Sequence, residues 1–99
     1  MSTQLAVEED VTIGFTSPGK YKVILFNDDQ TPMEFVIELL GAVFNKSIAE
    51  AEKITLEVHN TGRGVAGIYS YEIAEQKVHE ATIASRAHGF PLAFDLEEE

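Results

Sequence analysis

Asn27, Asp28 and Asp29 form a polar cluster that follows an apolar run and precedes Thr31-Pro32, so they stand in a predicted turn. Two adjacent acids on a short turn repel each other unless a cation or several hydrogen-bond donors offset their charges. One amide oxygen and two carboxylates can accept hydrogen bonds from an ammonium group, which offers three donors and no acceptor. A peptide α-amino group is such a cation at neutral pH, because its pKa is about 7.7–8.0. Ordinary turn and helix-cap chemistry fits the same spacing, so these residues leave both interpretations open.

A small metal-dependent hydrolase is the alternative interpretation of the same acids. It would use Asp28, Asp29 and His59, provided that the fold brings His59 to the turn. The three histidines of the chain stand at positions 59, 79 and 88. No pair therefore has the i, i+4 spacing by which one helix directs two imidazole rings at a metal ion. An aspartyl dyad would in addition need its acids to face each other across a cleft.

The composition limits the classes of protein to which this chain can belong. The chain has 99 residues, of which 44% are hydrophobic and none is Cys, so we expect one small domain without disulfides, thiolate metal sites or cysteine nucleophiles. Its net charge of −10 disfavours nucleic acid and anionic membrane surfaces as partners. The first 20 residues lack a targeting pattern, and no apolar run approaches the roughly 20 residues of a membrane span. We expect a water-soluble protein, and a reducing cytoplasm fits the absence of Cys.

The elements that must position the turn follow from periodicity and capping. A strand is predicted over residues 20–26, and Thr31-Pro32-Met33-Glu34 predicts a helix with Thr31 as N-cap and Glu34 completing a capping box. A second capping box, Ser47 with Glu50, predicts a helix that runs to about His59, with Ile48 on its buried face. A short strand over 65–69, a third helix from Ser70 to the stop at Gly89, and a closing strand over 92–96 complete the pattern.

This order predicts an α+β fold, a β-α-α-β-α-β sandwich in which three helices cover a small antiparallel sheet. Residues 1–19 mix acids with Ser, Thr, Gln, Gly and Pro. We expect them to form a flexible N-terminal tail ahead of one core domain over residues 20–97.

Four stretches of the sequence resemble the ClpS family. The most specific is Asn27-Asp28-Asp29-Gln30-Thr31-Pro32-Met33-Glu34-Phe35-Val36. The others are Val58-His59 with residues 62–67, Ala74-Glu75-Gln76-Lys77-Val78, and Pro91-Leu92. Members of this family are adaptors of the bacterial N-end rule. The resemblance implies a chain that is not an enzyme and needs no cofactor, and that captures proteins by a bulky hydrophobic N-terminal residue: Phe, Tyr, Trp or Leu.

The resemblance also implies roles for individual residues. The group expected to bind the α-amino group comprises Asn27, Asp28, Asp29 and His59, and we favour Asp29 for the closer contact. The apolar pocket for the side chain would be lined by Thr31, Met33, Val36, Thr55, Val58 and Leu92. Met33 resembles a gatekeeper that rejects β-branched side chains. Thr55 stands where many relatives carry Met, so we expect aromatic N-termini to be preferred over Leu.

The resemblance finally implies a partner to which the captured protein is delivered. The partner would be ClpA, the AAA+ unfoldase of the ClpAP protease, and Glu72 and Lys77 resemble positions that meet its N-terminal domain. The N-terminal tail would take part in delivery. We expect the chain to act as a monomer.

Overall fold

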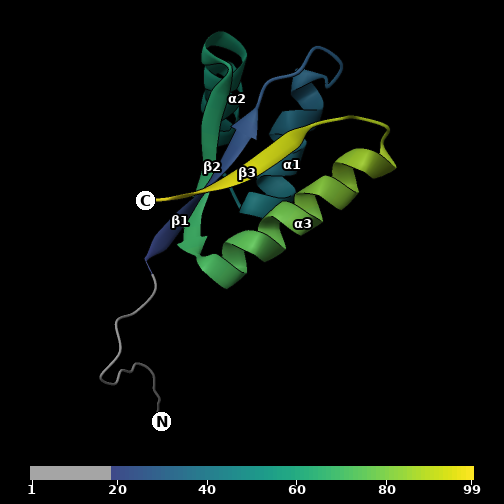
Figure 1. Cartoon of the computed structure of the whole chain (residues 1–99). Helices are drawn as coiled ribbons and strands as arrows, with labels where there is room; N and C mark the ends of the chain where they lie inside the picture. Colours follow the sequence, from purple (N-terminus) through teal and green to yellow (C-terminus); the bar gives the residue numbers. More distant parts are fainter. Residues whose placement is uncertain (1–18) are drawn as a thin grey trace, which may run out of the picture.

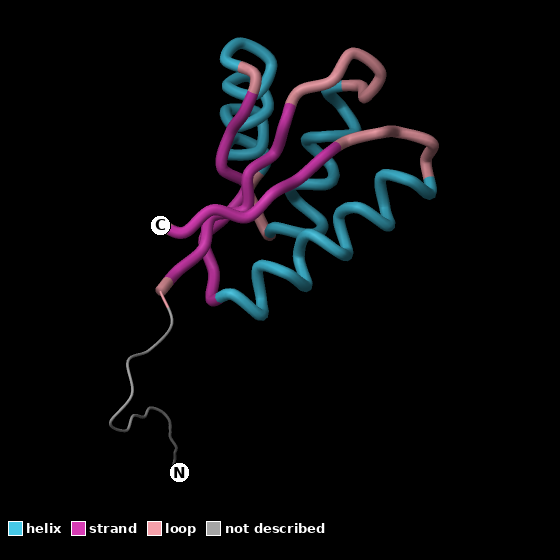
Figure 2. The backbone as a smooth tube through the Cα atoms, viewed as in Figure 1, coloured by secondary structure: helices cyan, strands magenta, loops and turns pink. Residues whose placement is uncertain are grey.

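The computed structural model describes residues 19–99, so the predicted tail lies outside the described residues except for Gly19. Six elements follow in the order β1 Lys20–Phe26, α1 Met33–Phe44, α2 Ile48–Thr61, β2 Arg63–Ser70, α3 Tyr71–Ala87 and β3 Ala93–Glu98. The strands form one antiparallel sheet in the order β2-β1-β3 (Figures 1 and 2). The predicted fold class is therefore confirmed, with β1 as the central strand.

The core lies on one face of the sheet. Side chains alternate between the two faces of a strand, so Val23 and Leu25 of β1 point to the same side. Both are fully buried in one cluster with residues of all three helices. The helix residues of that cluster are Val36, Leu39, Leu40, Phe44, Ala51, Val58, Ala74 and Ala81. The three helices thus bury their apolar sides against a single sheet face, as the sequence pattern predicts.

Helix ends show which capping predictions were correct. The Ser47 side chain accepts a hydrogen bond of 3.1 Å from the amide of Glu50, which confirms the predicted cap of α2. Ser70 occupies the N-cap position of α3 but makes no side-chain cap bond. Ile48 was expected on the buried face of α2, and this was wrong, because its side chain is 75% exposed. It is the first residue of the helix, ahead of the buried turn that begins at Ala51.

Contact between α2 and β2 depends on a glycine. A Cβ atom at Gly64 would lie 2.8 Å from Cγ2 of Val58, which is too close for two carbon atoms. We therefore expect Gly64→Ala to lower the free energy of unfolding by about 1–3 kcal/mol, the usual cost of overpacking. Urea denaturation will measure it. Gly19→Ala is the matched control, since a Cβ atom there meets nothing within 4 Å. Equal stabilities of the two variants would contradict the argument.

Within residues 19–99, no helix is both long and apolar enough to cross a membrane.

Candidate functional site

The turn between β1 and α1 is organised by the carboxylate of Asp28. One oxygen, Oδ1, accepts hydrogen bonds from the backbone amides of Gln30 at 2.8 Å and Thr31 at 2.9 Å, and Oδ2 accepts one from the Thr31 hydroxyl at 2.7 Å. The predicted capping box at Thr31 was therefore wrong. The Thr31 hydroxyl donates back to Asp28, and α1 begins at Met33 with Pro32 at the N-cap and no side-chain cap bond.

These contacts keep the Asp28 carboxyl ionised. Burial raises its pKa, but the Thr31 side chain, the two backbone amides and the positive charge of Arg86 outweigh burial and hold the pKa below its ordinary 3.8. A carboxylate that is already hydrogen-bonded in this way remains available to a cation on its free lone pairs. Asp28 thus stabilises the turn through its hydrogen bonds and also supplies a fixed negative charge.

The lowered pKa of Asp28 predicts how stability depends on pH. A group whose pKa is lower in the folded state contributes stability above its unfolded value, and this stability is lost as the pH falls through the folded value. We expect the difference in free energy of unfolding between the native chain and Asp28→Asn to be constant above about pH 5 and to shrink below about pH 3.8. Urea denaturation between about pH 2.5 and 6 measures this difference. A difference independent of pH would contradict the assigned hydrogen bonds.

A recess of about 20 Å³ opens beside this turn. Its lining includes three of the four residues predicted to bind an amine, Asn27, Asp28 and His59, and all six predicted pocket residues. The six pocket residues are Thr31, Met33, Val36, Thr55, Val58 and Leu92. Residues more than 60 positions apart along the chain thus meet in one place. The sequence interpretation missed Phe26, the last residue of β1, which also lines the recess. As an apolar residue at a strand end it carried no signal of its own.

The polar residues of this group differ in their placement. Asp29 is exposed and does not line the recess, whereas Asp28 does. His59, in the last turn of α2, is exposed and lines the recess. The backbone amide of Asn27 donates to the carbonyl of Gly62 at 3.0 Å, which ties the turn to the end of α2. That bond explains how a residue of the turn and a residue of α2 come to share one rim.

The apolar wall is partly fixed and partly movable. Val36, Val58 and Leu92 are buried in the core, while Met33 in the first turn of α1 is 39% exposed. A space of about 20 Å³ holds one water molecule, so a benzyl side chain enters only if a wall residue moves. Met33 is the wall residue with both exposure and three rotatable bonds to do so.

Thr55 is buried and its hydroxyl donates to the carbonyl of Ala51 at 2.7 Å. The hydroxyl proton is therefore held by the helix backbone. A ligand hydroxyl near Thr55 would have to act as the donor.

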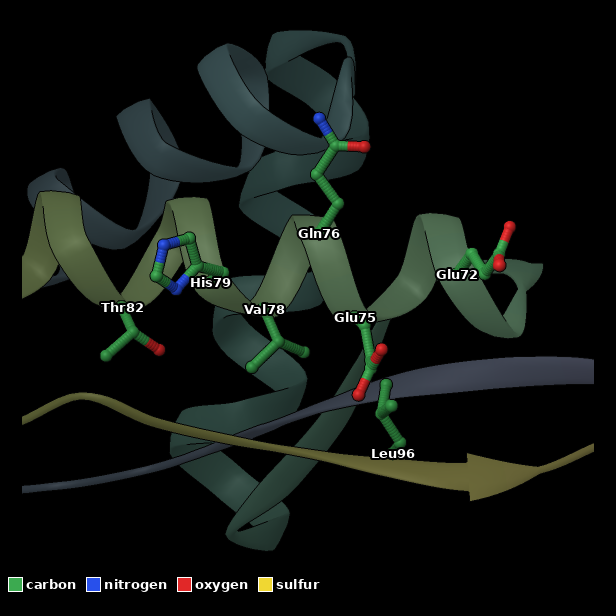
Figure 3. A pocket seen from close by; sticks show the side chains of 7 residues that line it. All are labelled: Glu72, Glu75, Gln76, Val78, His79, Thr82 and Leu96. Carbon is green, nitrogen blue, oxygen red and sulfur yellow. The ribbon is translucent and has the colours of Figure 1, made fainter.

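Glu72 and Lys77 lie on different sides of α3. Glu72 lines a groove between α3 and β3, and Figure 3 shows its side chain at one end of that groove, along the helix from Glu75 and His79. The Lys77 ammonium donates to the carbonyl of Val43 at 2.8 Å and lies 5.9 Å from the centre of the Tyr69 ring. Lys77 is half-buried, so part of its charge is already satisfied within the domain.

Within residues 19–99, no three His, Asp or Glu side chains gather closely enough to hold a metal ion. Asp28, Asp29 and His59 are not such a group.

Fold and recess together define a small α+β binding domain, with an apolar cavity whose rim carries an amide, a carboxylate and an imidazole. Comparison with known proteins then identifies the family. Residues 16–95 match the family described as "ATP-dependent Clp protease adaptor protein ClpS". The chain belongs to this family of protease adaptors.

Individual relatives support the assignment. The ATP-dependent Clp protease adapter protein ClpS of Acetivibrio thermocellus is 43% identical over 99 residues, which is 100% of both chains. That of Clostridium acetobutylicum is 52% identical over 81 residues, covering 82% of this chain and 80% of the relative. Among solved structures, Agrobacterium tumefaciens ClpS2 bound to L-phenylalaninamide superimposes with a TM-score of 0.80 at 43% identity, covering 83% of this chain and 99% of that one.

Proposed function

We propose that this chain binds N-degrons, proteins that begin with Phe, Tyr, Trp or Leu and carry a free α-amino group. The observation that carries the proposal is the recess, in which Asn27, Asp28 and His59 share one lining with an apolar wall. An ammonium at the rim can donate to an amide oxygen, a carboxylate and a neutral imidazole, while the side chain enters the apolar part. Asp29 is exposed beside Asp28 and adds negative charge that attracts the ammonium.

The related ClpS2 supports the choice of ligand. L-phenylalaninamide combines a free α-amino group with a benzyl side chain, and ClpS2 binds it in a structure that shares this fold. Both halves of that ligand have matching groups in this recess.

Delivery is the second part of the proposal. The chain hands its cargo to ClpA, the AAA+ unfoldase of the ClpAP protease, as a cytoplasmic monomer that is not itself an enzyme and needs no cofactor. Family membership supports a task in the Clp protease system. Glu72 is the better candidate for a contact with the unfoldase, because it is exposed at the start of α3. The ammonium of Lys77 is instead bonded to the carbonyl of Val43.

Isothermal calorimetry tests the binding step. A Phe-starting peptide should bind with one-to-one stoichiometry, and its N-acetylated form should not, because acetylation removes the charge and leaves the rim acceptors without partners. Adding a chelator should leave the affinity for the Phe-starting peptide unchanged. Loss of binding in chelator, or cleavage of the peptide, would instead support the hydrolase that uses Asp28, Asp29 and His59.

Delivery has its own test. Degradation of a Phe-starting reporter by ClpAP should require this chain, and Glu72→Lys should reduce degradation without changing peptide affinity. Normal degradation by Glu72→Lys would remove this residue from the interface.

A further inference from the structure

Arg86 connects the end of α3 to the segment that carries Leu92. It lies in the last turn of that helix, and its Nη1 atom donates to the carbonyls of Phe90 and Leu92, each at 2.9 Å. These two carbonyls flank Pro91, which has no amide hydrogen with which to tie the segment down. One guanidinium group therefore holds the backbone on both sides of Pro91.

The segment held in this way is part of the recess wall. The Leu92 side chain is 1% exposed and lines the recess, and the next residue, Ala93, begins β3 opposite Phe26 of β1. A shift of the Leu92 backbone would therefore move one wall of the recess against the others. Arg86 itself is exposed and does not line the recess.

The charge of Arg86 reaches the other side of the same site. Its guanidinium favours the ionised form of Asp28, the acid at the rim of the recess. Asp28 is ionised at neutral pH in any case, so the positioning role of Arg86 rests on its hydrogen bonds to Phe90 and Leu92.

We infer that Arg86 is a positioning residue for the recess, because its two hydrogen bonds fix the backbone of the segment that places Leu92 in the recess wall. The inference rests on the proposed binding of N-terminal residues. Arginine suits this task, because its planar guanidinium directs several donors at fixed angles. Lysine at this position would keep the charge but lose that fixed geometry.

Peptide affinity of Arg86 variants tests the inference. Arg86→Gln should weaken binding of a Phe-starting peptide by about tenfold and narrow the difference in affinity between Phe- and Leu-starting peptides, because one wall is no longer fixed. Arg86→Lys keeps the charge but loses the fixed donor geometry, so it should show the same losses of affinity and of the Phe-to-Leu difference as Arg86→Gln. Fluorescence anisotropy measures both dissociation constants, well below the thermal midpoint of each variant.

Lys20→Gln is the matched control, because it removes the same charge from an exposed residue at the far end of β1. Its affinity should equal that of the native chain. An equal loss in Lys20→Gln would mean that net charge alone matters, and this would overturn the inference. A lower thermal midpoint of Arg86→Gln with unchanged affinity would also overturn it, since the contact would then serve stability only. Failure of the native chain to bind the Phe-starting peptide would instead refute the proposed function.

Discussion

Asp28→Ala is expected to weaken binding of a Phe-starting peptide by about a hundredfold, the upper end of what the loss of a hydrogen bond to a charged group costs. The substitution removes a negative charge from the rim, and it also removes the acceptor of three hydrogen bonds that shape the turn. Calorimetry measures the affinity, and circular dichroism shows whether the sheet and helices persist. We expect the thermal midpoint to fall as well.

Asp29→Ala is the natural companion to this variant. Asp29 makes no contribution to the bonds that hold the turn, so its loss should leave stability unchanged and reduce affinity through charge alone. The sequence analysis favoured Asp29 for the closer contact with the amine, whereas the lining of the recess favours Asp28. A greater loss of affinity in Asp29→Ala than in Asp28→Ala would decide for Asp29. Unchanged affinity in Asp28→Ala would remove Asp28 from the site.

Met33→Ala is expected to admit peptides that begin with Val or Ile. Met33 lines a recess of only about 20 Å³, and truncation to Ala removes most of that wall at the first turn of α1. A β-branched side chain carries its extra methyl group close to the backbone, where the thioether would otherwise stand. We expect the affinity for a Val-starting peptide to rise by at least about tenfold, which corresponds to one or two methylene groups in a pocket. The affinity for a Phe-starting peptide should fall severalfold, because dispersion contacts are lost.

Met33→Leu provides the control for this prediction. Leu has nearly the same volume as Met, so this variant should still exclude Val and Ile. A peptide panel titrated against both variants gives the comparison. If Met33→Ala still excludes β-branched residues, Met33 supports the core and does not select the ligand.

Local pattern predicted most of the fold, and the Thr31 cap shows where such a pattern fails. The strand over residues 20–26 and the Ser47 cap were predicted correctly, because each depends on neighbouring residues alone. The Thr31 cap failed because Asp28, three residues earlier, competes for the same hydroxyl. Polar side chains in turns often bond to nearby backbone in this way, and a sequence pattern does not rank the competing partners.

The site was predictable only in part, because most of its residues meet only once the chain has folded. Asn27 and Asp28 stood out as a polar turn, but Val58 and Leu92 have the character of ordinary core residues. The resemblance to a family, and not periodicity, indicated that they line a recess. No sequence pattern indicated a role for Arg86, since its role depends on where the segment after α3 returns to the sheet.

The antiparallel sheet gives the molecule two distinct ends, one at the turn with the recess and the other where β1 begins and β3 ends. The amide of Glu99 donates to the carbonyl of Lys20 at 2.9 Å, so the chain enters β1 and leaves β3 at the same end of the sheet. The turn at Asn27 lies at the opposite end of the strand, about 20 Å away. A fluorophore, an affinity tag or a sensor surface attached after Glu99 therefore stays clear of the recess. Under the proposed function, the N-terminal residue of the cargo would bind at the recess end of the sheet, and a label attached after Glu99 would lie at the opposite end.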